Sequence, residues 1–335
     1  MDFTFEAIDE ALPGPKWKAM FDRLWPAYRE WFLADGIGER ATYLESRDML
    51  EAHMPRFLPS YDRLVELAGG QDIVARFLSL YRPPGYITGC SQVVWPGDEP
   101  VLIRNYDYAP GMTDGVILRS SWNGMGVIAM VDSMIGALDG INQAGLAVSL
   151  TFGGRRALGD GFGVPIVVRY LLEFCETTAE AAEVLKRVPS FMAHNVTVVD
   201  RAGAFVTAFL APDRPAVVRQ IPIATNHQGE VEWHNHARAT ATLERENFLS
   251  FRLSDGAMNA AKLADTFLQP PLYTRAYDRG FGTIYTAIYH PRRGTAEFRW
   301  PGASWHVSFD DFAEGSQDVT FAPAEGVLPF RGPGR

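Results

Sequence analysis

The sequence predicts an α+β protein with antiparallel sheets, on the basis of three features of its 335 residues. Helical spacing of apolar residues dominates the first part of the chain, short strand-like runs follow, and grouped helices then separate these from further strands. Consecutive strands with grouped helices are typical of the α+β class, whereas regular alternation would favour a parallel sheet. With 47% hydrophobic and 21% charged residues, the chain can form a sizeable core.

The N-terminal segment, residues 1 to about 85, has a helical pattern. Its large apolar side chains recur three and four residues apart, which is the period of one helix face. We expect Pro26 to kink or restart the first helix. Further helical patterns cover 42–54, 61–69 and 71–81, and the run RPPG then ends helix formation. The apolar residues of the first helix are Trp17, Met20, Phe21, Leu24, Tyr28, Trp31 and Phe32.

From residue 87 the pattern changes to short apolar or alternating runs, which are separated by Gly, Pro, Asp and Asn and therefore predict strands. These runs span residues 87–95, 100–107, 115–122, 126–133 and 145–152. Two helices, more strands, a helical region and a closing hairpin follow. Their ranges are 164–176 and 178–188 (helices), 195–200, 204–210 and 216–221 (strands), about 238–268 (helical) and 283–290 with 295–300 (hairpin).

The charge of the chain excludes several classes of partner. Lys and Arg number 31 against 40 Asp and Glu, so the formal net charge is −9. Nucleic-acid grooves and anionic-membrane surfaces need clustered basic residues, and no run reaches the roughly 18 apolar residues that span a bilayer. The start, MDFTFEAIDEALPG, is acidic where a secretory signal needs a basic flank. We therefore expect a cytoplasmic protein that binds neither nucleic acid nor membrane.

The two cysteines, Cys90 and Cys175, lie in different settings. Two cysteines in a chain of this length do not form a disulfide framework. Cys175 falls in an apolar helical run, which is typical of a small core residue. Cys90 falls where a Pro/Gly-rich loop becomes a strand, a place that presents a thiol. Cys90 is therefore the candidate nucleophile.

A cysteine nucleophile needs a base and an oxyanion hole. No histidine has a context typical of a cysteine protease. Cleavage before Cys90 would instead free an α-amino group with a reference pKa of about 7.7–8.0, which can take the thiol proton. We expect Gly89 to permit the strained backbone that lets the thiol attack the preceding carbonyl. His227, His234 and His236 lack the spacing of common zinc sites, so we expect no metal and no cofactor.

A family resemblance supports this hypothesis. GCSQVVW followed by PVLIRNYDY resembles the Gly-Cys junction and the Arg-Asn-aromatic-Asp segment of the penicillin acyltransferase-like family, the acyl-CoA:6-aminopenicillanic acid (isopenicillin-N) acyltransferases. This family belongs to the N-terminal nucleophile hydrolases, with penicillin V acylases and bile-salt hydrolases. The resemblance continues through LDGINQAGLAVSLTFGGR, GFGVPIVVRYLLE, HNVTVVDRAG, ATNHQ and TATLERENFL to the final hairpin. It covers nearly all of the chain after Cys90 and the helical segment before it.

The resemblance implies a four-layer αββα sandwich and a chain that cuts itself between Gly89 and Cys90. Residues 1–89 would be a helical pro-segment that becomes the small subunit, and residues 90–335 the catalytic domain that becomes the large subunit. We expect the two fragments to stay associated, because the small one carries many apolar side chains that would otherwise be exposed. The sequence leaves open whether the chain forms a homo-oligomer.

The resemblance also assigns roles to individual residues. Cys90 is the nucleophile, Arg104 favours the thiolate, and Asp107 orients the α-ammonium. Asn195 donates its side-chain amide to the oxyanion, and Thr151 supplies a backbone N–H to the same hole. Arg245 lies near the nucleophile with the Thr242 hydroxyl beside it, although the family more often has serine at the latter position.

Each role has a structural alternative. Arg104 and Asp107 could form only a structural ion pair, Asn195 could serve a turn, and Arg245 could be a solvated helix residue. Five aromatic residues near the motifs could line an acyl pocket or pack in the core. They are Trp95, Tyr106, Tyr108, Phe152 and Phe162.

The implied reaction is acyl transfer through a Cys90 thioester, with a small-molecule, linear, non-peptide amide as the substrate and hydrolysis as the outcome. A dedicated acyltransferase that moves an acyl group from a thioester donor to an amine is the alternative. A non-catalytic binding protein on the same scaffold is a further one, and retention of Gly89, Cys90, Arg104, Asp107 and Asn195 disfavours it.

Overall fold

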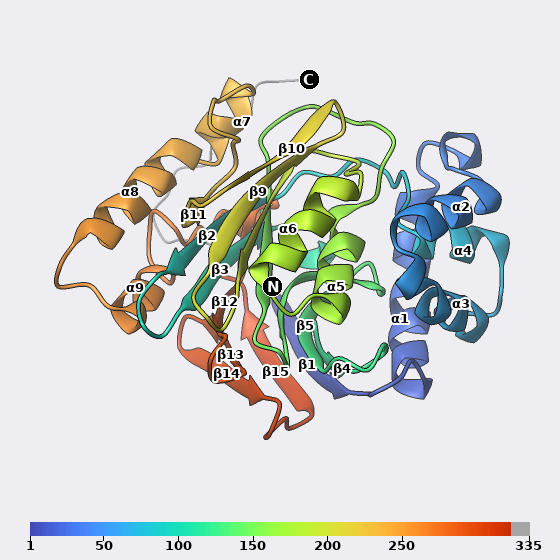
Figure 1. Ribbon diagram of the computed structural model, residues 1–335, viewed down its shortest axis with the longest axis horizontal. Helices are drawn as coiled ribbons and strands as arrows, with labels where there is room; N and C mark the ends of the chain where they lie inside the picture. The colour runs from blue at the N-terminus through green and yellow to red at the C-terminus, as the bar shows by residue number, and fades with distance from the viewer. Residues whose placement is uncertain (323–335) are drawn as a thin grey trace.

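Two β-sheets lie face to face in the computed structural model, which describes residues 1–322 (Figure 1). Gln92, two residues after Cys90, links them: it donates to Thr197 Oγ1 at 2.7 Å and accepts from Ser149 Oγ at 2.6 Å. Because all three side chains are buried, these hydrogen bonds satisfy polar groups that water cannot reach. Residues 323–335, the end of the expected 90–335 domain, lie outside the described residues.

The larger sheet has nine strands in the order β10-β9-β8-β7-β6-β5-β4-β1-β15. Neighbouring strands are antiparallel, except for β1 and β4, which run parallel. The strands are β1 (Asp2–Asp9), β4 (Val116–Ser120), β5 (Val127–Asp132), β6 (Gly136–Asn142), β7 (Ala147–Phe152), β8 (His194–Val199), β9 (Phe205–Ala211), β10 (Arg214–Arg219) and β15 (Gly315–Thr320).

The smaller sheet has six strands in the order β11-β2-β3-β12-β13-β14, and all neighbouring pairs are antiparallel. Its two buried strands β2 and β3 include Cys90, Arg104 and Asp107. The candidate nucleophile therefore lies inside the molecule. The strands are β2 (Gly89–Trp95), β3 (Val101–Tyr108), β11 (Ile223–Ala224), β12 (Gly282–His290), β13 (Thr295–Trp300) and β14 (Ala303–Ser308).

Helices cover the outer faces of both sheets (Figure 1). Helix α5 packs on β5, β6 and β7, and α6 packs on β8, β9 and β10. On the other side, α8 packs on β2 and β11, where Leu249 joins Val93 and Ile103 in one apolar cluster. These layers form the expected αββα sandwich. The helices are α5 (Val164–Phe174), α6 (Thr178–Arg187), α7 (His234–Ala239), α8 (Thr242–Ser254) and α9 (Ala260–Thr266).

The N-terminal segment contains four helices, as expected, but it begins with a strand. Residues Asp2–Asp9 form β1, between β4 and β15, which corrects the expectation of helix from the first residue. Phe3, Phe5 and Ala7 alternate with polar residues, a period of two that favours a strand. Pro26 lies within one continuous helix, so the helix does not restart there. The helices are α1 (Pro15–Phe32), α2 (Tyr43–His53), α3 (Leu58–Leu67) and α4 (Asp72–Leu78).

A membrane-spanning helix must be both long and apolar. None of the helices within residues 1–322 combines the length and the hydropathy needed to cross a bilayer.

Candidate active site

Cys90 is the second residue of β2, and its thiol is fully buried between the two sheets. It pairs with Tyr106 of β3. Directly opposed residues of an antiparallel pair lie on the same face, as do residues two apart in one strand. Arg104 therefore shares this face, and its Nη2 lies 3.2 Å from Cys90 Sγ. We call this face the thiol side.

Arg104 is held in place from the larger sheet. Its Nη1 donates to Asp139 Oδ2 at 2.5 Å and to the Leu138 carbonyl at 3.1 Å. The Asp139 carboxylate also accepts hydrogen bonds from the hydroxyls of Tyr285 and Tyr289. Burial raises the pKa of the Cys90 thiol, and the positive charge of Arg104 opposes that rise. Arg104 thus lies where the resemblance expects it, with its positive charge beside the thiol.

Asp107 lies on the opposite face of β3, away from Arg104. Its Oδ1 accepts from Thr283 Oγ1 at 2.7 Å, and its Oδ2 lies 3.5 Å from Arg245 Nη1. Burial raises the pKa of the Asp107 carboxyl, and Arg245 opposes this rise. The structural ion pair between Arg104 and Asp107 that the sequence left open is not formed, because each residue has another partner of opposite charge.

Arg245, in α8, reaches the backbone of Cys90. Its Nη1 donates to the Cys90 carbonyl at 2.6 Å and to Ser91 Oγ at 2.7 Å, and its Nη2 donates to Asn226 Oδ1 at 2.6 Å. The side chain is 3% exposed, which excludes the solvated alternative. Arg245 therefore belongs to the site. We call this region, where the Cys90 nitrogen lies, the nitrogen side.

Asn226, like Asp139, is a site residue that the sequence did not identify. Its Oδ1 accepts from the backbone nitrogen of Cys90 at 3.1 Å, and its Nδ2 donates to the Phe152 carbonyl at 3.0 Å. The Thr242 hydroxyl accepts from the Asn226 backbone nitrogen at 2.7 Å, so Thr242 positions this residue. The motif ATNHQ, which contains Asn226 and was part of the resemblance, was the available signal.

Asn195 and Thr151 contact each other, and Asn195 contacts the residues on either side of Asn226. Asn195 Nδ2 is within 3.1 Å of Thr151 Oγ1, 2.8 Å of the Thr225 carbonyl and 3.0 Å of the His227 carbonyl. The amide nitrogen has two N–H donors, so these three acceptors use both of them, and two acceptors share one N–H. Asn195 therefore holds the segment that carries Asn226. It lies in strand β8, not in a turn, and among residues 1–322 its side chain forms no hydrogen bond with Cys90.

Gly89 is an extended strand residue without a positive φ angle. The expected strained backbone is therefore absent at this position. A Cβ atom there would lie 2.4 Å from Phe281 Cζ, closer than real Cβ contacts allow, and 3.2 Å from Asp107 Cβ, which is a tight contact. The glycine thus permits the close packing of Phe281 against β2, beside the bond to Cys90.

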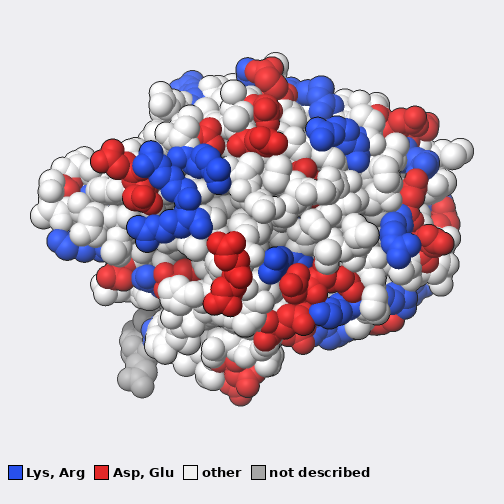
Figure 2. All heavy atoms as spheres, turned by 60° about the horizontal axis from the view of Figure 1, so that its bottom comes forward, with Lys and Arg blue, Asp and Glu red and all other residues white. Residues whose placement is uncertain are grey.

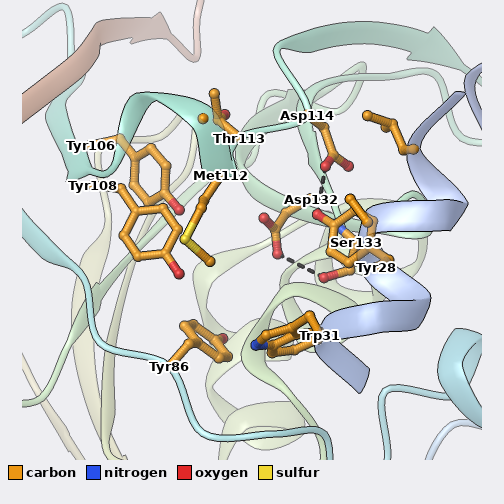
Figure 3. Close-up of a pocket in the computed structure, with 13 residues that line it drawn as sticks. Tyr28, Trp31, Tyr86, Tyr106, Tyr108, Met112, Thr113, Asp114, Asp132 and Ser133 are labelled. Atoms are coloured by element: carbon orange, nitrogen blue, oxygen red, sulfur yellow. Dashed lines mark hydrogen bonds between the residues drawn. The ribbon is translucent and has the colours of Figure 1, made fainter. Parts of the chain in front are cut away.

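A cavity of about 140 Å³ borders the thiol side, between the sheets and α1 (Figure 3). Of the five aromatic residues that the sequence offered for a pocket, Tyr106 and Tyr108 line it. Trp95 packs in the apolar cluster under α8, Phe152 against His194 and His236, and Phe162 against Tyr81. The cavity lining is Leu24, Ala27, Tyr28, Trp31, Tyr86, Tyr106, Tyr108, Gly111, Met112, Thr113, Asp114, Asp132 and Ser133.

Comparison with solved structures found similar folds at low sequence identity. Penicillin V acylase from Agrobacterium tumefaciens is 16% identical, with a TM-score of 0.48 over 66% of this chain and 86% of that chain. A mutant of conjugated bile acid hydrolase from Clostridium perfringens is 10% identical, with a TM-score of 0.41 over 72% and 100%. An N-acylethanolamine-hydrolyzing acid amidase ortholog from Caenorhabditis elegans is 16% identical, with a TM-score of 0.40 over 61% and 93%.

A comparison with curated protein sequences gave no match. The family model for acyl-coenzyme A:6-aminopenicillanic acid acyl-transferase, however, matches residues 94–305, which is more than half of the chain. The matched segment begins just after Cys90 and includes Arg104, Asp107, Asn226 and Arg245. The chain therefore belongs to the acyl-coenzyme A:6-aminopenicillanic acid acyl-transferase family, as the sequence motifs predict.

Proposed function

We propose that this protein is a self-processing enzyme that cleaves linear, non-peptide amides through a Cys90 thioester. One observation carries the proposal: the Cys90 thiol contacts the Arg104 guanidinium, while the Cys90 nitrogen contacts the Asn226 amide oxygen. The first contact favours a thiolate. The second would hold an α-amino group beside the thiol after cleavage, where it can serve as the base.

Activation would proceed by attack of Cys90 Sγ on the Gly89 carbonyl. The Gly89–Cys90 C–N bond breaks, a thioester forms, and the nitrogen takes the thiol proton. Water then hydrolyses the thioester, which leaves a carboxylate on Gly89 and a free amine on Cys90. Asp107 lies opposite Gly89 in the β2–β3 pairing, and its carboxylate would orient the new ammonium.

In the processed enzyme, the α-amine would take the thiol proton as Sγ adds to the substrate carbonyl. The tetrahedral oxyanion needs N–H donors. Within residues 1–322, Asn226 Nδ2 makes one hydrogen bond, to the Phe152 carbonyl, which leaves its second N–H to offer. We assign the oxyanion role to Asn226, with Asn195 as the residue that positions it. The C–N bond then breaks, and the α-ammonium gives its proton to the leaving amine. Water completes hydrolysis of the thioester.

Acyl transfer to an amine is the second candidate, because the family model that matches is that of an acyl-transferase. In that case an acyl thioester would acylate Cys90, and an amine would take the place of water. In both candidate reactions the acyl group is carried as a thioester on Cys90.

The N-terminal segment is proposed to remain as a structural subunit after cleavage. Strand β1 lies between β4 and β15, so loss of residues 1–89 would remove a strand from within the larger sheet. Trp17 of α1 is buried, and its Nε1 donates to the Met134 carbonyl at 2.8 Å. Size-exclusion chromatography should give one species that contains both fragments, whereas separate elution with an active large fragment would disprove this role.

Two measurements test the function. Intact mass of fresh wild-type protein should show fragments that meet between Gly89 and Cys90. A panel of acyl amides, lactams and acyl-homoserine lactones should then yield acyl adducts on Cys90 after rapid acid quench, detected by peptide mass spectrometry. An active wild-type protein that stays one chain would contradict the N-terminal nucleophile mechanism.

A further inference from the structure

The cavity that Tyr106 lines has an aromatic wall on each side (Figure 3). Tyr106, which is directly opposite Cys90, and Tyr108 form one wall, and Tyr28 and Trp31 of α1 form the other, with Tyr86 between them. Its volume of about 140 Å³ is close to that of a cavity of about 150 Å³ that holds one benzene ring. The space therefore suits a group of about six heavy atoms.

Two carboxylates line the same cavity. Asp114 accepts from Tyr28 OH at 2.5 Å and from the Met134 nitrogen at 3.0 Å, and Asp132 Oδ2 accepts from Ser133 Oγ at 3.0 Å. Within residues 1–322, neither carboxylate forms an ion pair with Lys, Arg or His. Acidic and basic groups are interspersed on the surface face in Figure 2. The cavity differs, because its charged lining is acidic only.

Unpartnered hydroxyls point to a ligand in this space. Thr113 is 7% exposed, and its Oγ1 has no hydrogen-bond partner among the described residues. The buried hydroxyl oxygen of Tyr86 is likewise without a partner there. Both residues line the cavity. Buried polar atoms nearly always have a hydrogen-bond partner. An ammonium group has three N–H donors, so two hydroxyl oxygens could accept those that a carboxylate does not.

The turn at the base of the cavity is strained. Ser133 and Met134, between β5 and β6, have positive φ angles of 54° and 62°. Such angles are costly for residues with side chains and persist where the surroundings enforce them. Here Tyr28 OH accepts from the Ser133 nitrogen at 3.0 Å, and Asp114 accepts from the Met134 nitrogen. Tyr28 of α1 thus holds the backbone of the turn that follows Asp132.

We propose that the enzyme selects acyl groups that end in a primary ammonium and that this cavity binds that end, beside Asp132. This substrate class rests on the proposed Cys90 amidase. Aromatic faces and a carboxylate together are the means by which proteins bind organic cations. A metal ion is not favoured, because no group of three or more His, Cys, Asp or Glu suited to a metal occurs within residues 1–322.

The ammonium belongs to the acyl part because of where the Cys90 nitrogen lies. The α-amine protonates the leaving amine, and its nitrogen faces Asn226 on the nitrogen side. The leaving group must therefore depart there. The acyl chain then extends toward the thiol side, where Tyr106 leads into the cavity.

Three p-nitroanilides of matched length test this selection on processed wild-type enzyme: 6-aminohexanoyl, heptanoyl and adipoyl. The 6-aminohexanoyl group places five methylenes and one nitrogen beyond the carbonyl, and heptanoyl replaces the ammonium with methyl. We expect kcat/KM for 6-aminohexanoyl to exceed that for heptanoyl by about tenfold or more, with adipoyl slowest. Asp132→Asn should bring the ratio near one, whereas Glu30→Gln on the exposed face of α1 should preserve it. A wild-type preference for heptanoyl would overturn the proposal.

Calorimetric titration with n-pentylammonium and with n-pentanol separates this inference from the proposed reaction. Binding of the ammonium but not the alcohol, lost in Asp132→Asn, supports the cavity assignment even if none of the anilides is hydrolysed, a result that would count against the amidase. Hydrolysis of the anilides without ammonium preference or ammonium binding overturns the cavity assignment and leaves the amidase standing. Failure of both hydrolysis and binding overturns both.

Discussion

The two sides of the Cys90 backbone are built in different ways. On the thiol side, Arg104 from one sheet is held by Asp139 from the other, so the group proposed to favour the thiolate belongs to the buried interior. On the nitrogen side, Arg245 comes from α8 and Asn226 from the segment after β11. The charge beside the proposed nucleophile is thus set by the sandwich. The groups that surround the bond proposed to be cut come from one helix and one loop.

The largest expected effect concerns the residue that both sides share. Cys90→Ala should abolish self-cleavage and lower turnover by at least about 10³-fold, because the nucleophile and its α-amine are lost together. Intact mass and activity measure both. Cys175→Ala is the matched control, since Cys175 is the other buried free thiol and should still be cut. Cleavage of the Cys90→Ala chain at the same bond would show that another group performs it.

The thiol side should respond to loss of its charge pair in both stability and pH profile. Arg104→Met leaves Asp139 buried without its cation, which should cost about 3–5 kcal/mol in the free energy of unfolding. It also removes the charge that lowers the pKa of the Cys90 thiol, so the rising limb of kcat/KM should move to higher pH.

A second substitution separates these two effects. Adding Asp139→Asn to Arg104→Met should restore part of the stability, because no unpaired buried charge remains, but should not restore the pH profile. Chemical denaturation and pH–rate profiles report the two readouts. A double variant that is no more stable than Arg104→Met alone would show that the pair does not couple as described.

The nitrogen side should separate a catalytic amide from a positioning one. Asn226→Ala should lower turnover by about 10²–10³, or about 2.7–4 kcal/mol, if its free N–H binds the oxyanion. Asn195→Ala should chiefly lower the free energy of unfolding, by about 1–3 kcal/mol, because the carbonyls of Thr225 and His227 lose their donor. Steady-state kinetics and thermal melts distinguish them. If Asn195→Ala lost more turnover than Asn226→Ala and kept its stability, the oxyanion role would return to Asn195.

The same comparison shows what the sequence could predict. The strand patterns around Cys90, with the Arg-Asn-aromatic-Asp segment, identified Arg104 and Asp107, because alternation and family motifs are local features. Asp139 and Asn226 were missed as site residues, because each reaches the site through a tertiary contact between distant segments: 35 residues separate Asp139 from Arg104, and 136 separate Asn226 from Cys90. Strand β1 was missed because large apolar residues just after it dominate the pattern of the N-terminal segment.

The smallest effect concerns the acidic groups of the two sides, which differ in their counter-charges. Asp107 on the nitrogen side faces Arg245. On the thiol side, burial raises the pKa of Asp132 from 3.8 to about 6, and no residue of 1–322 forms an ion pair with it. Between these two pH values the folded state holds a proton on Asp132 that the unfolded chain has released. Stability from this group therefore falls as pH rises from about 4 to 6, by at most about 3 kcal/mol. Arg104 opposes the rise in pKa, and the neighbouring Asp114 titrates as well.

Asp132→Asn removes this titration, so the variant should gain stability relative to wild type as pH rises through that window. Urea unfolding of both proteins at pH 5 and pH 7.5 gives the free energy of unfolding of the variant relative to wild type at each pH. We expect this difference to be more favourable to the variant at pH 7.5. Asp48→Asn, on an exposed position of α2, controls for the loss of one surface charge and should follow wild type at both pH values. A constant difference between Asp132→Asn and wild type would mean that Asp132 is as well solvated in the folded protein as in the unfolded chain. The thiol side would then lack the uncompensated carboxylate that distinguishes it from the nitrogen side.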